Sequence, residues 1–235
     1  MTNALTLRGI TRTFPGGLHV LNQLDMDVPA GGIFVILGHS GCGKSTLLRI
    51  IGGFDKADYG TVLLGRELVT KPRPDMIMMF QSYDQLFPWQ TLRGNLVFAL
   101  QQSGVERDPQ KAHACADEYL KKTGLSGFEN AYPHTLSGGM KQRGALARAL
   151  CLAPGVLLMD EPFSSLDFLT RRAMQRLLMQ LQREAGITIV LVTHDIEEAL
   201  RIGDTITVLD KTTGRLVACE KDAAKLEAFL TQQSS

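Results

Sequence analysis

Residues 38–46 combine glycine, lysine and hydroxyl side chains in an order that suits the binding of phosphate. They read G-H-S-G-C-G-K-S-T, which fits the pattern G-x-x-x-x-G-K-S/T, and they separate the apolar runs 33–37 and 47–51. The glycines allow backbone turns that a Cβ forbids, so successive N–H groups can point into one concavity and hold phosphate oxygens. We therefore predict a phosphate-binding loop between a strand and a helix. The alternative, a glycine-rich turn with a chance lysine, is disfavoured by the flanking pattern.

Single positions in this loop have separate expected roles. The Lys44 ammonium should reach the β- and γ-phosphates, beside the partial positive charge at the start of the following helix. Ser45 should offer its hydroxyl to Mg²⁺. Cys42 lies near Lys44 and the helix N-terminus, so we expect a lowered thiol pKa and protection of the thiol by bound ATP; the alternative is that it only fills a slot for a small residue. The loop residues expected to contact the nucleotide are Gly38, His39, Ser40, Gly41, Cys42, Gly43, Lys44, Ser45 and Thr46.

Two acidic residues follow the apolar run 156–159 directly. Continuous apolar runs are typical of strands in a parallel sheet with both faces covered, and functional groups gather at the carboxyl ends of such strands. Asp160 is therefore placed to hold Mg²⁺ through water. Glu161 is placed to orient or deprotonate a water molecule.

Two more buried strands are expected over residues 76–80 and 188–192, and polar side chains follow both. Gln81 and His194 should therefore lie at the same edge of the sheet as the phosphate loop. A lone histidine is usually structural, but at this edge we favour contact between His194 and a γ-phosphate. Asp195 should then cap a helix, with Glu198 in the reciprocal position of a capping box.

A second potential anion site lies far along the chain, where a helix over residues 138–152 is expected. Ser137 is a good N-cap, and Gly138 and Gly139 leave backbone N–H groups uncovered for an anion to approach. A simply capped helix is the alternative. If this helix N-terminus and the one after the loop 38–46 both bind phosphate, one copy of the chain carries two incomplete sites. A second copy in a two-fold contact could then complete each of them.

The elements that position these residues indicate an α/β fold. Residues 4–28 alternate in short pieces around turns and predict a small antiparallel sheet, which residues 61–64 join. Phe14 precedes the turn at 15–17 and either stacks on a purine or packs in the core of this sheet. The remaining expected elements are helices over 92–102 and 110–123, a strand over 206–209, a hairpin over 211–217 and an amphipathic helix over 222–232.

Length and composition exclude several classes of protein. The 235 residues suffice for one large domain, and a net charge of +1 lacks the basic footprint of nucleic-acid binders. We expect no secretory signal and no membrane span, because no run approaches the roughly 18 apolar residues that a span needs. The four cysteines are scattered, without zinc spacing, which indicates a reduced, cytosolic chain. Any work at a membrane should go through a partner.

Taken in order, residues 38–46, Gln81, 136–143, 156–161, 165–167 and His194 resemble the motifs of the ATP-binding cassette (ABC) family of ATPases. The resemblance covers nearly the whole chain. It implies a P-loop NTPase core with a mostly parallel sheet, an N-terminal antiparallel β subdomain and an inserted α-helical subdomain. All would belong to a single ABC ATPase domain over 1–235, with the core and β subdomain at about 1–81 and 154–235 and the helical subdomain at about 82–153.

The resemblance also implies a role for each matching residue. It implies ATP hydrolysis with Mg²⁺, adenine stacking by Phe14, a general base at Glu161 and a γ-phosphate contact at His194. The implied catalytic residues are Lys44, Gln81, Glu161 and His194; the implied metal site is Ser45, Gln81 and Asp160; and Ser137, Gly138, Gly139 and Asp167 join the nucleotide-binding set. Met140 stands where glutamine is frequent in the family, and we expect binding to survive this change.

Partners and location follow from the same resemblance. ATP would lie between the phosphate loop of one copy and residues 137–139 of another in a head-to-tail dimer, bound to integral membrane permease subunits at the cytoplasmic face of the inner membrane. Residues 86–89 look like the importer branch for nitrate, sulfonate, taurine and bicarbonate, whose complete systems include a solute-binding protein. Trp89 either contacts the permease or, as we favour, anchors the core. Cassette ATPases of lipid trafficking, cell division, DNA repair or translation remain alternatives.

Overall fold

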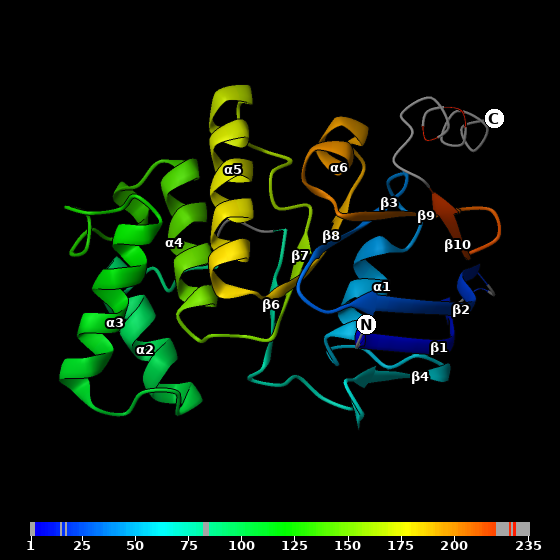
Figure 1. Ribbon diagram of the computed structural model, residues 1–235, viewed down its shortest axis with the longest axis horizontal. Helices are drawn as coiled ribbons and strands as arrows, with labels where there is room; N and C mark the ends of the chain where they lie inside the picture. The colour runs from blue at the N-terminus through cyan, green and yellow to red at the C-terminus, as the bar shows by residue number, and fades with distance from the viewer. Residues whose placement is uncertain are drawn as a thin grey trace.

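The computed structural model describes residues 3–14, 16, 18–81, 85–219, 226 and 228. Within this part of the chain, two sheets lie near each other and a group of helices occupies the opposite end of the molecule (Figure 1). The antiparallel strands β1, β2 and β4 lie at one end, and helices α2, α3 and α4 lie at the other. The expected amphipathic helix over 222–232 falls outside the described residues, apart from positions 226 and 228.

The core sheet is mostly parallel, as predicted. Its strand order is β10-β9-β3-β8-β7-β6, and only β10 runs antiparallel to its neighbour among these described strands. Every residue of β3, β7 and β8 is buried, because both faces of the sheet are covered. The strands are β3 (Ile33–Leu37), β6 (Met76–Met79), β7 (Val156–Asp160), β8 (Thr188–Thr193), β9 (Thr205–Leu209) and β10 (Leu216–Cys219).

The N-terminal sheet is antiparallel with the strand order β2-β1-β4-β5, which confirms the sequence expectation. The short alternating pieces in the sequence merge into two long strands, and register shifts between them absorb the interruptions. The strands are β1 (Asn3–Phe14), β2 (Leu18–Pro29), β4 (Tyr59–Leu64) and β5 (Glu67–Leu68).

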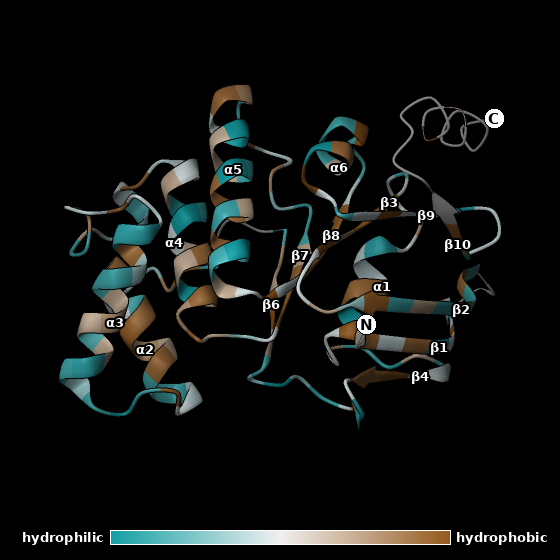
Figure 2. Ribbon diagram, in the orientation of Figure 1, coloured by the Kyte–Doolittle hydropathy of each residue, from teal (hydrophilic) through white to brown (hydrophobic). Residues whose placement is uncertain are grey.

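The helices cover the core sheet on both faces. Successive strand residues point to opposite faces. Val35 belongs to the apolar cluster that includes residues of α4, α5 and α6, whereas Ile36 belongs to the cluster that includes α1 and the antiparallel sheet. Figure 2 shows hydrophobic residues along the core strands and mixed hydropathy along α5. The helices are α1 (Lys44–Ile51), α2 (Leu92–Ser103), α3 (Pro109–Lys122), α4 (Gly138–Leu150), α5 (Phe168–Ala185) and α6 (Ile196–Ile202), with a 3-10 turn η1 (Pro133–Thr135).

Helices α2, α3 and α4 have an apolar cluster of their own. Leu96, Ala116 and Ala147, one from each helix, belong to this cluster and not to those around the core sheet. The segment therefore buries its own apolar side chains as well as packing on the core.

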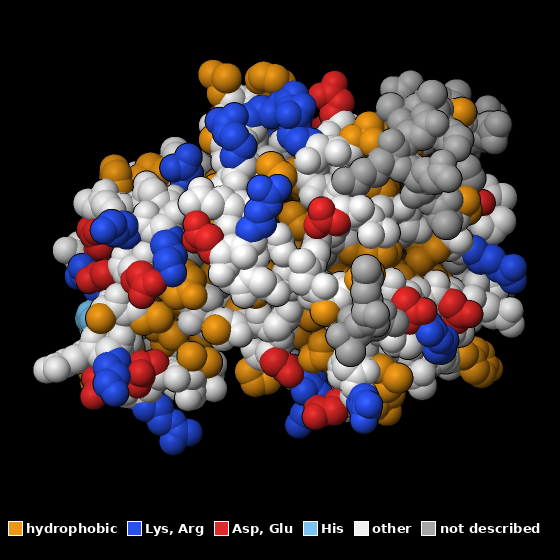
Figure 3. Space-filling model, viewed as in Figure 1, with side chains coloured by type: hydrophobic (Ala, Val, Ile, Leu, Met, Phe, Trp, Pro, Cys, Tyr) orange, Lys and Arg blue, Asp and Glu red, His pale blue; other side chains and the backbone are white. Residues whose placement is uncertain are grey.

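Among the helices of the described residues, none has both the length and the apolar composition that a membrane span requires. Figure 3 shows acidic and basic side chains mixed over the visible face, in keeping with the small net charge.

Candidate functional site

The carboxylate of Glu161 is where side chains from several strand ends meet. Lys44 Nζ lies 3.6 Å from Oε1, and His194 Nδ1 lies 3.1 Å from Oε2. Gln81 donates to the same Oε2 from its Nε2 at 3.4 Å. The four residues that the sequence marks as catalytic thus converge on one carboxylate, because β3, β6, β7 and β8 all end at this edge of the sheet.

The main chain at Glu161 turns sharply as it leaves β7. Its φ is 44°, in the left-handed region that side chains other than glycine rarely adopt. Its N–H donates to the Val192 carbonyl at 3.0 Å, which extends the pairing of β7 with β8 by one residue. Such a conformation costs on the order of 1 kcal/mol and is typical of functional sites. The turn places the carboxylate, whose side chain is 14% exposed, over the sheet edge toward the phosphate loop.

The phosphate loop closes tightly around Lys44. The buried ammonium donates to the carbonyls of Gly38 at 2.8 Å and His39 at 2.9 Å. A Cβ on Gly38 would lie 2.7 Å from Cys42 Sγ, and a Cβ on Gly43 would lie 2.4 Å from a Val20 methyl group. Gly43 also has a φ of +104°, so neither position accepts a side chain.

The remaining loop positions lie on the outer face of the turn or enter α1. Ser40, Gly41 and Ser45 are exposed, whereas His39 and Thr46 are half-buried. Gly41 has a φ of +78° with open space around it, so the backbone there is accessible from solvent. The loop therefore presents backbone and hydroxyl groups outward while it keeps its lysine buried.

The thiol of Cys42 does not behave as predicted. Cys42 is buried, and burial raises the pKa of its thiol, although Lys44 and backbone N–H groups act in the opposite direction. The expectation of a lowered pKa is therefore wrong, because desolvation outweighs the nearby positive charge. The alternative, a small residue filling a tight slot below Gly38, agrees with the structure.

The expected Mg²⁺ ligands lie at three adjoining strand or loop ends. Ser45 Oγ donates to Asp160 Oδ1 at 3.0 Å, and Gln81 lies across from them on Glu161. Burial raises the pKa of Asp160, while the bond from Ser45 acts to lower it. Among the described residues no cluster of three His, Cys, Asp or Glu side chains could hold a metal alone. Hydroxyl, amide and carboxylate oxygens nevertheless suit Mg²⁺, which takes few protein ligands and completes its shell with water and phosphate.

The turn after β8 differs from the expected capping box. Asp195 Oδ1 accepts from the Glu198 N–H at 3.0 Å, as predicted. The Asp195 N–H, however, donates to Thr193 Oγ1 at 3.1 Å, and that hydroxyl donates to Glu198 Oε2 at 2.7 Å. The predicted bond from the Asp195 N–H to the Glu198 side chain is therefore wrong, because the Thr193 hydroxyl accepts that N–H and itself donates to Glu198. Sequence reasoning missed Thr193, although a hydroxyl at a strand end before a cap was the signal available.

Phe14 and Trp89 are both exposed, which excludes the core position that was one alternative for each. Phe14 is 39% exposed at the end of β1, with the Arg12 guanidinium 5.6 Å from its ring centre, so it is not a core residue. Trp89 is 70% exposed and packs on Phe87, with ring centres 5.4 Å apart. The expectation that Trp89 anchors the core is wrong: its neighbour Leu86 is the buried residue.

The second predicted anion site lies on a separate surface. Ser137 caps α4 by accepting the Met140 N–H at 3.3 Å, and Asp167 caps α5 by accepting the N–H groups of Leu169 and Thr170 at 3.1 Å each. Hydrogen bonds from the Thr170 side chain and from the N–H groups of Thr170 and Leu169 lower the pKa of the Asp167 carboxyl. A hollow of about 520 Å³ joins the two caps and is lined by Ser137, Gly138, Gly139, Met140, Arg143, Ser165, Leu166, Asp167 and Thr170.

This hollow shares no residue with the phosphate loop. In Figure 1, α1 and α4 lie on opposite sides of β6 and β7. One chain thus carries two separate groups of candidate residues, one at the loop and Glu161, and the other at the starts of α4 and α5. The structure does not bring Ser137, Gly138, Gly139 and Asp167 to the phosphate loop of the same chain.

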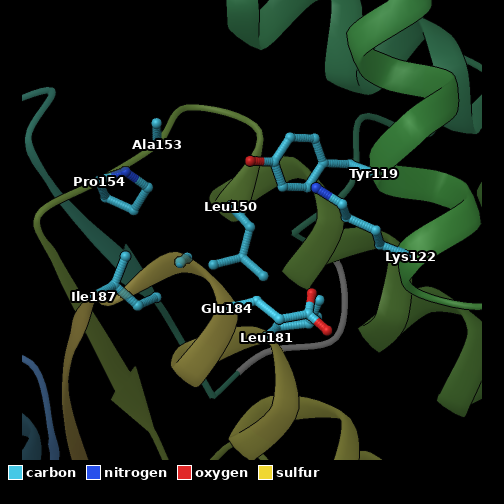
Figure 4. A pocket seen from close by; sticks show the side chains of 9 residues that line it. Tyr119, Lys122, Leu150, Ala153, Pro154, Leu181, Glu184 and Ile187 are labelled. Carbon is cyan, nitrogen blue, oxygen red and sulfur yellow. The ribbon is translucent and has the colours of Figure 1, made fainter.

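A further hollow of about 320 Å³ lies between α3, residues 150–154 and α5 (Figure 4). Tyr119 and Lys122 line one side, and Leu181 and Glu184 line the other. It contains none of the residues that the sequence singles out. The cluster at Glu161 is therefore the candidate site because polar side chains converge there, and not because of the size of a hollow.

Several known proteins are similar to this chain. A family model described as "ABC transporter" matches residues 21–164. The nitrate import ATP-binding protein NrtC of Synechococcus elongatus is 42% identical over 195 residues, which are 83% of this chain and 29% of that protein. The chain thus spans less than a third of that relative. The taurine import ATP-binding protein TauB of Rhizobium johnstonii is 43% identical over 201 residues, 86% of this chain and 76% of that protein.

The fold also matches a solved structure. It is a dimeric post-hydrolysis state of the ATP-binding cassette MJ0796, bound to ADP and Pi. The TM-score is 0.79 at 31% sequence identity, and the match covers 92% of this chain and 99% of that chain. The antiparallel sheet, the mostly parallel core sheet and the helical insert are therefore those of an ABC ATPase.

Proposed function

This chain belongs to the ABC transporter family, and from that membership we propose that it is the ATP-binding and ATP-hydrolysing subunit of an importer. The observation that supports this function most directly is the convergence of Lys44, Gln81 and His194 on Glu161. We further propose that residues 1–235 form one ABC ATPase domain, in which about 82–153 make up the helical subdomain.

ATP would bind with its phosphates in the loop 38–46. The exposed backbone of Ser40 and Gly41 and the start of α1 offer N–H groups to phosphate oxygens, and Lys44 adds a positive charge beside them. Phe14 would stack on the adenine, since its exposed ring lies at the end of β1. A bound Mg²⁺, held by Ser45 and Gln81 with Asp160 beside it, would offset the charge of the phosphates.

Glu161 would act as the general base. Its carboxylate lies at the sheet edge, against Lys44 and His194, where a water molecule could attack the terminal phosphate. Gln81 and His194 would orient this water and the γ-phosphate. Phosphoryl transfer depends more on positioned charge than on covalent help from the protein, so the preformed cluster suits the reaction.

Hydrolysis would require two copies of the chain. The hollow at Ser137–Gly139 and Asp167 is remote from the loop of its own chain, so a head-to-tail dimer would place it against the partner's nucleotide. The solved relative MJ0796 is a dimer in a post-hydrolysis state. Closing and opening of this dimer would then transmit force to a permease.

The permease would dock on the exposed aromatic surface formed by Phe87, Trp89 and Phe98. The Arg148 guanidinium lies 5.3 Å from the Phe87 ring centre in a groove of about 240 Å³ next to this surface. Docking there would hold the subunit at the cytoplasmic face of the inner membrane. A solute-binding protein would complete the importer.

The solute would be a small molecule or ion such as nitrate, a sulfonate, taurine or bicarbonate. The names of NrtC and TauB support this class, and they differ in solute at nearly equal identity to this chain. The solute itself would be selected by the permease and the binding protein, since nothing in the cluster at Glu161 is shaped for it.

The test of this function is the Glu161→Gln variant of the purified chain. Glutamine cannot accept the proton, so we expect phosphate release from ATP to fall at least about 100-fold, while ATP affinity stays within about twofold. Phosphate release and binding of a fluorescent ATP analogue measure the two effects. Hydrolysis at the wild-type rate in this variant would refute the base assignment, and an inactive wild type would refute the proposed function.

A further inference from the structure

A ring of hydrogen bonds holds the turn that carries His194. The Asp195 N–H donates to Thr193 Oγ1 at 3.1 Å, and the Thr193 hydroxyl donates to Glu198 Oε2 at 2.7 Å. The Glu198 N–H donates in turn to Asp195 Oδ1 at 3.0 Å. The three residues thus tie the end of β8 to the first turn of α6, with His194 between them.

His194 itself takes no part in this ring. Its imidazole is 51% exposed and contacts Glu161, with Nδ1 3.1 Å from Oε2. A half-exposed side chain has few packing neighbours to hold it, so its position depends on the backbone of residues 193–195. That backbone is fixed by the hydrogen bonds of Thr193 and Glu198.

Glu198 is an unusual residue to find beneath such a turn. It is 5% exposed, and its Oε1 is buried without a hydrogen-bond partner among the described residues. Its charged surroundings are Asp195, the Arg171 guanidinium from α5 and His194. An unpartnered buried oxygen is destabilising. The structural effect of the carboxyl group that the contacts show is to hold the Thr193 hydroxyl.

From this geometry we infer that Glu198 is a positioning residue for His194, which it holds within reach of Glu161 through the Thr193 hydroxyl. The inference rests on the proposed function, because it assigns a purpose to the contact between His194 and Glu161. It adds the side chains of two residues, Thr193 and Glu198, to the site. The Thr193 backbone is already tied to the phosphate loop, because its carbonyl accepts the Gly38 N–H at 3.2 Å.

The first experiment separates catalysis from nucleotide binding in steady-state ATP hydrolysis. We expect Glu198→Ala and Thr193→Val to lower kcat about tenfold with KM for ATP within about twofold, since a small displacement of a reacting group is enough for such a loss. Glu198→Gln and Thr193→Ser keep the acceptor and the hydroxyl, and should retain most of the activity. Glu197→Ala, at the exposed neighbouring position, is the matched control.

The second experiment asks whether the effect passes through His194. Groups that act as a unit are non-additive, so Glu198→Ala should cause no further loss in a His194→Ala background. A full additional tenfold loss there would overturn the inference, as would wild-type kcat in a folded Glu198→Ala variant. If Glu198→Ala does not fold, the pair Thr193→Val and Thr193→Ser carries the same test.

A third measurement needs no hydrolysis. The imidazole NMR signals of His194, assigned by their loss in His194→Gln, should shift in Glu198→Ala and Thr193→Val and stay in place in Glu197→Ala. Unchanged signals in an active protein would overturn this inference alone. Shifted signals in a protein that hydrolyses no ATP would uphold the positioning contact and refute the proposed function.

Discussion

At the scale of single residues, the Glu161 carboxylate is the point at which the polar side chains of the candidate site meet. Its left-handed backbone turns the carboxylate away from the strand direction, and three side chains from other elements then reach it. Two of these, Lys44 and His194, carry or can carry positive charge. The carboxylate thus lies among side chains from three other strand ends, in a position that the sequence order of the residues does not reveal.

Lys44 should dominate the affinity for nucleotide. Removing its ammonium in Lys44→Ala deletes charge-assisted contacts with phosphate, so we expect the Kd for ATP to rise about 10- to 100-fold. Titration with a fluorescent ATP analogue measures this, and Lys56→Ala, an exposed lysine outside the loop, is the control. Wild-type affinity in Lys44→Ala would contradict the role of the loop.

Glu198 should make stability depend on pH in a defined direction. Burial raises its pKa from 4.5 to about 7, so the folded chain keeps a proton that the unfolded chain has released. Its contribution to stability is therefore complete below pH 4.5 and is lost as the pH rises to about 7. At about 1.4 kcal/mol for each pKa unit, the loss is about 3 kcal/mol.

The Glu198→Gln variant tests this dependence, because glutamine does not titrate. Between pH 4.5 and 8, the free energy of unfolding of the variant should gain about 3 kcal/mol relative to wild type. Urea unfolding at several pH values provides the measurement. A constant difference across this range would contradict the prediction.

At the scale of elements, the turn before α2 buries some of its side chains and exposes others. Leu86 and Leu92 are buried in the cluster of α2, α3 and α4, whereas Trp89 lies outside on Phe87. Asn95 holds the turn by accepting the Phe87 N–H at 2.7 Å. The aromatic pair is therefore presented on a fixed turn, as a docking surface requires.

Trp89 should matter for the permease. In Trp89→Ala we expect several-fold less integral membrane protein to co-purify with the tagged chain from detergent-solubilised membranes, because a large exposed aromatic is a typical anchor of an interface. Tyr59→Ala removes another highly exposed aromatic, on the antiparallel sheet, and is the control. Equal recovery in both variants would argue against this surface.

At the scale of the whole molecule, the proposed composite site is divided into two half-sites that lie apart on one chain. The loop half lies where α1 meets the core sheet, and the Ser137 half lies between α4 and α5. A single chain could bind ATP at the loop alone, but the two halves could enclose it only in a pair. Dimer closure would then be the step that completes the catalyst.

ATP should therefore drive dimer formation when hydrolysis is blocked. In Glu161→Gln we expect sedimentation to show a dimer with ATP and a monomer without it. Adding Ser137→Arg, which fills the second half-site with a bulky side chain, should leave the chain monomeric while ATP still binds. A dimer that forms equally well with Ser137→Arg would refute the composite site.

The sequence by itself determined the elements and the identity of the reactive groups. Strands 33–37, 156–160 and 188–193 were recognisable because apolar runs must be buried on both faces, and glycine and lysine spacing predicted the loop before α1. The helices of the insert were likewise predicted, within a few residues at their ends. The antiparallel sheet was predicted from short pieces that the structure joins into two long strands. These features depend on the pattern of neighbouring residues, which can be read directly from the sequence.

Only the tertiary structure decided the environment of each group. Burial raised the pKa of Cys42 where its neighbours in sequence predicted a fall, and Trp89 proved exposed because Leu86 filled the core instead. The bond between Thr193 and Glu198 replaced the reciprocal half of the capping box. The contacts of Lys44, Gln81 and His194 with Glu161 join four strand ends. Desolvation and contact depend on what packs around a residue in three dimensions, and that is not a property of its sequence neighbours.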